Sequence, residues 1–167
     1  VVADYARAFG MEVVWWSFEA GRARAKADGE TVAESRAAFF GTCDVVSLHL
    51  RLTSETRGSV TADDLGAMPP RSVLVNTSRA GLIAEGALLQ ALNAGHLGAA
   101  AVDVFDFEPL TDPSDPLLSH PKMIATPHIG FVTEDEFDKQ FADIFEQVNA
   151  YAAGAPIHMI NPSVYAP

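Results

Sequence analysis

Arg79, Glu108 and His128 each stand shortly after a short apolar run of the sequence. A guanidinium is a planar, permanently charged group that can bind a carboxylate through two hydrogen bonds. An imidazole titrates near neutral pH and can exchange a proton with a hydroxyl or carbonyl oxygen. A carboxylate beside the imidazole can fix its tautomer and favour its charged form. If the fold brings the three together, they predict acid–base chemistry on a small organic anion.

The secondary structure that must position these residues can be predicted from the apolar pattern. Five short runs, rich in β-branched and apolar side chains, predict buried strands. They are EVVWW (12–16), DVVSLHL (44–50), SVLVNT (72–77), GAAAVDVF (98–105) and MIATP (123–127). Amphipathic stretches predict helices at VVADYARAF (1–9), TVAESRAAFF (31–40), TADDLGAM (61–68), AEGALLQALNAG (84–95) and TEDEFDKQFADIFEQVNAYAAG (133–154). This alternation is typical of a doubly wound α/β fold, a parallel sheet covered by helices on both faces.

Parallel strands end at the same edge of a sheet, and the ligands of open α/β sheets bind beyond that edge. The residues that follow the predicted strands are therefore the candidate ligand contacts. They are Ser17 and the segments 49–53, 76–79, 103–108 and 128–130. Because this set includes Arg79, Glu108 and His128, we expect these three side chains to face the same small molecule.

The longest predicted helix, residues 133–154, has one apolar face. Thr133 and Glu136, three residues apart, predict a capping box at its start. The face consists of Phe137, Phe141, Ile144, Phe145 and Val148. We expect this face to be buried in a core or an interface.

Composition narrows the classes of function. The chain has 167 residues, 49% hydrophobic and 20% charged, as in globular rather than disordered proteins. Its 22 acidic and 11 basic side chains give a net charge of −11, which argues against nucleic-acid binding. No apolar run predicts a membrane span, and the single Cys43 argues against a disulfide framework. These features favour a cytoplasmic protein.

The histidines do not form a metal-ligand pattern. Those outside the candidate set are His49, His96, His120 and His158. They are far apart in the sequence, and no cysteine cluster accompanies them. We therefore expect no metal site.

Two stretches carry a specific resemblance. LVNTSRAGLIAEGALLQALNAGHLGAAAVDVFDFEPL (74–110), followed by HPKMIATPHIG (120–130), resembles the D-isomer-specific 2-hydroxyacid dehydrogenase family, and the likeness covers essentially the whole chain. It implies a Rossmann-like NAD(P)-binding domain and hydride transfer between a nicotinamide cofactor and C2 of a small D-2-hydroxy or 2-oxo acid. The resemblance also implies that Arg79 binds the substrate carboxylate and carbonyl oxygen. His128 would then be the general acid/base, with Glu108 as its partner.

The same resemblance implies contacts with the dinucleotide. Those on the nicotinamide side are Thr77, Ser78, Arg79, Asp103, which would hold the carboxamide, His128 and Gly130. Those on the adenosine side are Ser17, Leu50 and Arg51.

The identity of the dinucleotide depends on a departure from the family pattern. Ser17 stands where NAD-preferring members often have an acidic residue for the ribose hydroxyls. Arg22 and Arg24 follow closely and could pair with a 2′-phosphate, although the start of a helix more often leaves such residues solvated. NAD is the expected cofactor, and NADP is the alternative.

Two further departures concern the loops of the predicted site. Arg51 replaces a proline that is common in the family, so the adenine-side loop is expected to differ in shape. Ala80 replaces the glycine that usually follows the arginine, and Gly81 is expected to supply the missing flexibility.

The beginning of the chain predicts an incomplete domain. No GxGxxG occurs, and the sequence opens in a predicted helix with no strand before it. We therefore expect the first strand, placed between EVVWW and SVLVNT, and the glycine loop to be lacking. Residues 1–127 are expected to be the C-terminal part of the dinucleotide-binding domain. Residues 128–167 are expected to be a crossover helix and tail that return to the substrate domain.

Alternative functions stay open at this point. Some proteins that resemble this family are dinucleotide-sensing corepressors that bind partner peptides. The chain as given could also be an inactive fragment of the dehydrogenase, which continues upstream. For the whole enzyme, the resemblance implies a homodimer.

Overall fold

The computed structural model describes residues 1–165, which fall into two compact units, residues 1–128 and the residues from Ile129 onward. The first unit contains α1 (Val2–Ala8), α2 (Glu19–Ala27), α3 (Arg36–Thr42), β1 (Val45–Leu48), α4 (Ala62–Ala67), β2 (Val73–Asn76), the 3-10 helix η1 (Ala80–Leu82), α5 (Ala87–Asn93), β3 (Ala99–Val102) and β4 (Met123–Ala125). The second unit contains α6 (Glu134–Ala152) and the 3-10 helix η2 (Pro162–Val164).

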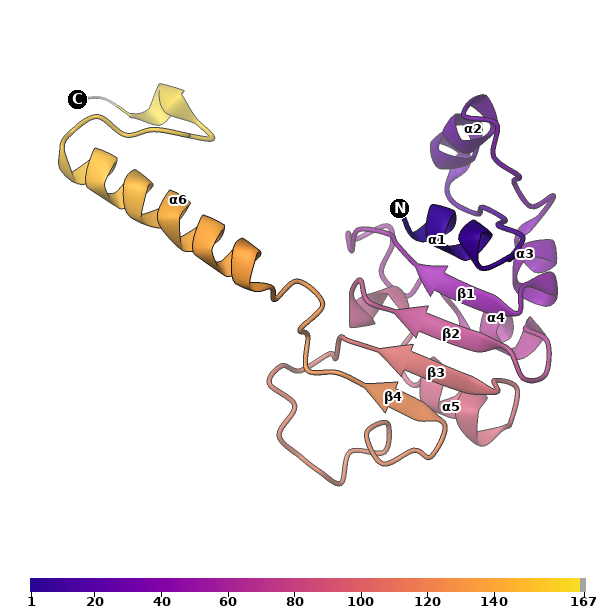
Figure 1. Ribbon diagram of the computed structural model, residues 1–167. Helices are drawn as coiled ribbons and strands as arrows, with labels where there is room; N and C mark the ends of the chain where they lie inside the picture. Colours follow the sequence, from indigo (N-terminus) through magenta and orange to yellow (C-terminus); the bar gives the residue numbers. More distant parts are fainter. Residues whose placement is uncertain (166–167) are drawn as a thin grey trace. The chain divides into compact units, whose positions relative to one another are not determined.

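The sheet of the first unit is parallel, with the strands in the order β1-β2-β3-β4 (Figure 1). The register pairs Leu48 with Asn76 and Asn76 with Val102, so the ends of the first three strands are level. Each crossover therefore returns the chain to the same starting edge, and the four carboxyl ends share the opposite edge. The predicted α/β class with a parallel sheet is confirmed.

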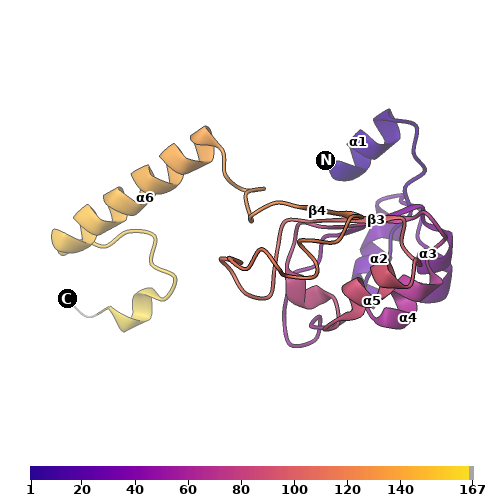
Figure 2. The same cartoon turned by 90° about the horizontal axis from the view of Figure 1, so that it is seen from below.

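One face of the sheet carries the core. Figure 2 shows α3, α4 and α5 on this face and α1 on the other side. Alternate strand residues point into the helical layer and are buried, as the two-residue period of a strand requires. The core includes Val46, Leu48, Leu65, Leu74, Leu82, Leu92, Leu97, Ala100 and Val102. The opposite face is only half covered: Val45 is 48% exposed, and α1 buries none of its residues. Within residues 1–128, the face opposite the core thus carries less helical cover than the face that holds it.

The first predicted strand is wrong as a member of this sheet. In EVVWW only Trp15 pairs, through an isolated parallel bridge to Val32. The N–H of Trp15 donates to the carbonyl of Thr31 at 2.8 Å, and the N–H of Ala33 donates back to the carbonyl of Trp15 at 3.1 Å. Residues 31–33 take part in this pairing and are not helical, so the predicted helix 31–40 begins later, with α3 at Arg36.

The sheet order limits where the expected strand between EVVWW and SVLVNT could pair. β2, formed from SVLVNT, is paired on both sides, with β1 and with β3. Such a strand could therefore pair only with the free side of β1, and its presence stays a prediction. In the part of the chain that the structure describes, β1 is the edge strand of the sheet.

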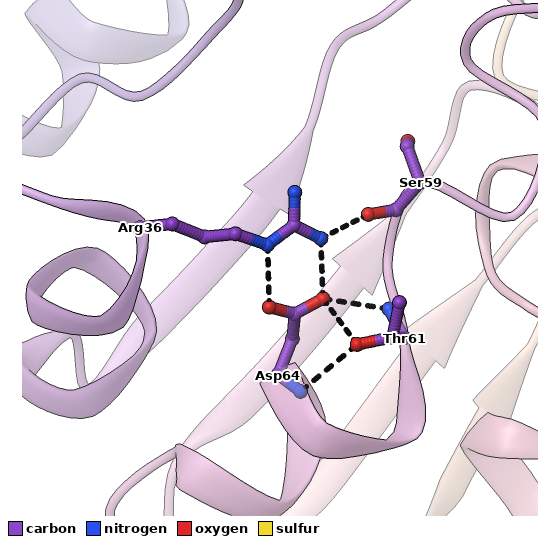
Figure 3. Close-up of polar contacts among 4 residues, drawn as sticks. All are labelled: Arg36, Ser59, Thr61 and Asp64. Carbon is purple, nitrogen blue, oxygen red and sulfur yellow. Dashed lines mark hydrogen bonds and ion pairs between the residues drawn. The ribbon is translucent and has the colours of Figure 1, made fainter.

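An ion pair fixes α3 against the start of α4 (Figure 3). The guanidinium of Arg36 donates from Nε to Oδ1 of Asp64 at 2.7 Å and from its terminal nitrogen to Oδ2 at 2.5 Å, and it also donates to the carbonyl of Ser59. Asp64 also closes a capping box with Thr61, whose hydroxyl oxygen accepts from the Asp64 N–H. One buried carboxylate therefore caps α4 and holds α3 at the same time.

The second unit is dominated by α6. The Thr133 side of the predicted capping box forms, because the Thr133 hydroxyl accepts the Glu136 N–H at 3.2 Å. The rings of Phe137 and Phe141 lie 4.4 Å apart between centroids, and Phe145 continues the row. Among the described residues, no helix is both long enough and apolar enough to cross a bilayer.

Candidate active site

Glu108 and His128 form a direct pair at the carboxyl edge of the sheet. Nδ1 of His128 lies 2.6 Å from Oε2 of Glu108, and the other carboxylate oxygen accepts the N–H of Phe105 at 2.8 Å. The two side chains are about one-third exposed, 31% for His128 and 35% for Glu108. Both oxygens of Glu108 are thus engaged, while solvent or a small molecule can still reach the pair.

The pKa of Glu108 lies below its ordinary value. The hydrogen bond from the Phe105 N–H is the main cause, followed by the hydrogen bond from His128, and the charges of His128 and Arg79 act in the same direction. An ionised carboxylate only accepts hydrogen bonds. Glu108 therefore requires a proton on Nδ1 of His128, which makes Nε2 the nitrogen whose protonation can change.

The backbone presents His128 in an uncommon conformation. Its φ of +55° lies in the left-handed region, which few residues other than glycine adopt. Its N–H donates to the carbonyl of Thr126 at 3.0 Å, across Pro127. This tight turn immediately after β4 directs the imidazole to Glu108, which arrives from the segment after β3.

Arg79 lies in the turn that follows β2, directly before η1. Its side chain is exposed, and the guanidinium donates to the carbonyl of Ser78 at 2.6 Å. The charge of Arg79 is close enough to act on the carboxylate of Glu108. The structure thus places the three predicted catalytic side chains at one edge of the sheet, as the sequence predicts.

The predicted nicotinamide contacts lie on three of the strand ends. Thr77 and Ser78 precede Arg79 in its turn, and the Ser78 hydroxyl donates to the carbonyl of Leu48, the last residue of β1. Asp103 follows β3, is 5% exposed, and accepts the hydroxyl hydrogen of Thr126 at 2.5 Å. Sequence reasoning missed Thr126, whose position two residues before His128 was the available signal. Gly130 belongs to the second unit.

The predicted adenosine contacts fall in two places. Leu50 and Arg51 follow β1 at the carboxyl edge. Ser17 lies outside the four-stranded sheet, after the segment that pairs only at Trp15. Arg22 is held beside it: the guanidinium lies 4.6 Å from the ring centroid of Trp16 and donates to the carbonyl of Ser17 at 2.5 Å. Arg22 is therefore held by neighbouring groups and only partly exposed, whereas Arg24 is exposed.

The loop after β1 packs against the Arg79 turn. The carbonyl of Arg51 accepts the hydroxyl of Thr56 at 2.7 Å, and this buried hydroxyl in turn accepts the N–H of Thr53 at 2.7 Å. A Cβ added to Gly81 would lie 2.8 Å from Nη1 of Arg57 and 3.2 Å from a methyl carbon of Leu52. Glycine at position 81 thus lets two chain segments approach each other closely, a role different from the flexibility expected of it.

The remaining chemistry of the described residues is limited. They contain no group of three histidine, cysteine or acidic side chains arranged to hold a metal ion. Burial raises the pKa of the Cys43 thiol, which leaves it protonated and unreactive at neutral pH. The arrangement that remains is a cation, a carboxylate and an imidazole at the carboxyl edge of a parallel sheet.

A comparison with protein families assigns this arrangement to a class. Residues 1–130 match the family model described as "D-isomer specific 2-hydroxyacid dehydrogenase, NAD binding domain". The chain belongs to this family, as the sequence resemblance predicted, and the matched part is its NAD-binding domain.

Particular relatives agree with the family. The D-3-phosphoglycerate dehydrogenase of Bacillus subtilis is 37% identical over 162 residues, which are 93% of this chain and 29% of the relative. The glyoxylate reductase of Aeropyrum pernix is 34% identical over 166 residues, 98% of this chain and 48% of the relative. A crystal structure from Ralstonia solanacearum, provisionally described as a D-3-phosphoglycerate dehydrogenase, has a TM-score of 0.93 and 44% identity. It covers 99% of this chain, which spans 48% of that structure. The chain thus spans half or less of the length of these relatives.

Proposed function

We propose that the protein containing this chain transfers a hydride between a nicotinamide dinucleotide and C2 of a small D-2-hydroxy or 2-oxo acid. The observation that carries the proposal is the 2.6 Å pair between Glu108 and His128, with the charge of Arg79 acting on the same carboxylate. Membership of the family and the match to its NAD-binding domain support the proposal.

The residues present fit the nicotinamide end of the cofactor. Asp103 offers a buried carboxylate at a strand end, an acceptor suited to the amide NH₂ of a carboxamide. Thr77 and Ser78 lie in the neighbouring turn. The bound dinucleotide would supply or accept the hydride at C2 of the acid.

Each catalytic residue then has a distinct task. Arg79 holds the substrate carboxylate and the oxygen on C2, since its guanidinium can donate to both. His128 gives a proton from Nε2 to that oxygen when the 2-oxo acid is reduced and takes it back when the hydroxy acid is oxidised. Glu108 accepts the hydrogen bond from Nδ1 and keeps the ring in the required tautomer.

A kinetic experiment on the full-length protein tests the proposal. Glyoxylate, hydroxypyruvate and further 2-oxo acids are assayed with NADH and with NADPH, in wild type and in His128→Ala. We expect turnover in wild type and a kcat at least about 10²-fold lower in the variant, because a positioned acid/base contributes about that factor or more. The Kd of the dinucleotide should change little. Wild-type activity that survives in His128→Ala would contradict the role of His128.

We also propose which dinucleotide the protein prefers. We expect NAD(H), given the family's description of this domain. The guanidinium of Arg22 beside Ser17 offers a cation for a 2′-phosphate, so the NADPH arm of the assay decides between the two cofactors.

The remaining expectations concern the whole protein. We infer that it is a homodimer, that it binds no nucleic acid, in keeping with the net charge of −11, and that it acts in the cytoplasm. We further propose that residues 128–167 lead back to a substrate domain. Sedimentation analysis of the full-length protein tests the homodimer, and a monomer at micromolar concentration would contradict it.

A further inference from the structure

Asn76 is a buried polar residue in an otherwise apolar row. It is the last residue of β2 and is 1% exposed. At the same level of the sheet, Leu48 ends β1 and Val102 ends β3, and both are buried apolar residues. Burial of an amide is costly unless both its donor and its acceptor are satisfied. The contacts of this amide therefore indicate what it does.

The Asn76 side chain bonds on both sides to the backbone of the turn that carries Arg79. Its Nδ2 donates to the carbonyl of Arg79 at 2.9 Å, and its Oδ1 accepts the N–H of Ser78 at 3.1 Å. An amide is suited to this double contact because it carries a donor and an acceptor on one planar group. The amide thus spans the turn from its middle to its end.

The position of the Arg79 guanidinium depends on this backbone. The side chain is exposed, and its guanidinium bonds to the carbonyl of the adjacent Ser78, within the same turn. A cavity of about 180 Å³ borders the turn and is lined by Asn76, Ala80 and Phe105, among others. Because packing leaves space on that side, the hydrogen bonds of the amide must contribute to holding the turn in place.

We propose that Asn76 is a positioning residue that sets the place of the Arg79 guanidinium relative to Glu108 and His128. The inference rests on the proposed function of Arg79 as the group that holds the 2-oxo acid. Substrate-binding groups must be held within a fraction of an ångström of the productive geometry, and a displacement of about 1 Å can lower the rate by about 10²-fold. A loosened turn should therefore weaken substrate binding more than dinucleotide binding, to which Asp103, outside this turn, also contributes in the proposal.

The test uses Asn76→Asp and Asn76→Ser in the full-length protein, with glyoxylate and NADH as probes. Aspartate keeps the acceptor for Ser78 but loses the donor to the Arg79 carbonyl, and serine reaches neither group in the same way. We expect kcat/KM for glyoxylate to fall about tenfold or more, mainly through KM, and the Kd of NADH to change by a smaller factor. Val46→Ala, a core variant on β1, controls for loss of stability. It should lower Tm but leave kcat/KM within about twofold.

A double-mutant cycle with Arg79→Lys separates positioning from a general structural effect. If Asn76 acts through Arg79, Asn76→Asp should change kcat/KM by less than about twofold once Arg79 is lysine. The inference alone would be overturned if the effects of the two substitutions on kcat/KM multiply in the double variant. It would also be overturned if an Asn76 variant loses no more kcat/KM than Val46→Ala at equal Tm. If Arg79→Lys by itself leaves kcat/KM unchanged, the proposed function of Arg79 is wrong, and this inference fails with it. If Asn76→Asp does not fold, the same kinetic measurements on Asn76→Ser test the inference.

Discussion

Oε2 of Glu108 and Nδ1 of His128 lie 2.6 Å apart, although the two residues come from segments that follow different strands. The carboxylate is also fixed by the N–H of Phe105, so the imidazole is oriented by a group that is itself held by the backbone. The low pKa of Glu108, caused first by that N–H and then by His128, keeps the carboxylate ionised at any pH above its ordinary value of about 4.3. Glu108 can therefore accept the hydrogen bond from Nδ1 of His128 throughout the neutral range.

Replacing Glu108 by glutamine should impair catalysis more than binding. The amide can still accept the N–H of Phe105, but its NH₂ can donate to Nδ1 and so favour the wrong tautomer of His128. We expect kcat to fall by about tenfold or more, a smaller loss than the about 10²-fold or more expected when the acid/base itself is removed. Steady-state kinetics with a 2-oxo acid measures the effect, and Glu85→Gln, outside the catalytic set, is the control. A kcat equal to wild type would show that the carboxylate does not orient the ring.

Thr126 should contribute to dinucleotide binding through Asp103. Its hydroxyl donates to the buried carboxylate at 2.5 Å, and valine keeps the shape of the side chain but removes the donor. We expect Thr126→Val to raise KM for NADH several-fold, by about 1 kcal/mol of lost binding, since a lost hydrogen bond is worth about that much. KM for the 2-oxo acid should change less. Thr126→Ser, which keeps the hydroxyl, should behave like wild type, and equal losses in both variants would contradict this role.

The ion pair between Arg36 and Asp64 should stabilise the fold in a pH-dependent way. Burial raises the pKa of Asp64, but the hydrogen bonds from Arg36 and Thr61 outweigh it, and the net shift is downward. A carboxylate with a lowered folded-state pKa contributes stability above its unfolded pKa of about 3.9 and loses it as pH falls through the lower, folded value.

Asp64→Asn should therefore lower the free energy of unfolding by about 1–3 kcal/mol at pH 7, less than for a fully buried pair because the Arg36 side chain is 45% exposed. Urea denaturation at pH 7 and at pH 3 measures the difference, which should shrink at the acidic value. Asp63→Asn, at an exposed position of the same helix, is the matched control and should have little effect. A difference that is the same at both pH values would contradict the assignment.

Two glycine-to-alanine changes should have opposite effects on stability. A Cβ at Gly98 would lie 2.5 Å from the backbone of Arg71, and neither segment can yield without shifting β3. Gly98→Ala should cost about 1–3 kcal/mol, as overpacking does. Gly66, inside α4, has no atom within 4 Å of an added Cβ, so Gly66→Ala should stabilise by about 0.5–1 kcal/mol. Thermal unfolding of both variants measures the effects, and a stable Gly98→Ala protein would refute the close contact.

The sequence predicted those parts of the fold that residue type determines locally. Four of five apolar runs became strands of one parallel sheet, and Gly86 and Gly95, both with positive φ, bracket α5. EVVWW has the same pattern as the others, but whether a run joins the sheet depends on its neighbours in space, and here only Trp15 pairs. α2 was not among the predicted amphipathic helices, although Arg22 and Arg24 were placed at a helix start, because its sequence, EAGRARAKA, is mostly polar or small and lacks a clear apolar stripe.

The same difference between local residue type and three-dimensional neighbours applies to the candidate site. Arg79, Glu108 and His128 were singled out because they follow successive predicted strands, and the family resemblance then implied their roles. Asn76 and Thr126 were not assigned roles, since amides and hydroxyls are common at such places. Their importance appears only in the hydrogen bonds to Arg79 and Asp103, which depend on three-dimensional geometry.

The loop after β1 and the turn that holds Arg79 are joined outside the sheet. The N–H groups of Gly58 and Val60 donate to the carbonyls of Gly81 and Leu82, and the N–H of Ala84 donates back to Val60. Surface loops usually tolerate insertions and deletions. Here a residue gained or lost between β1 and Val60 would shift this short ladder and displace Arg79 with it. The lengths of the two connections are therefore constrained together, and insertions are better tolerated in loops that leave this ladder intact.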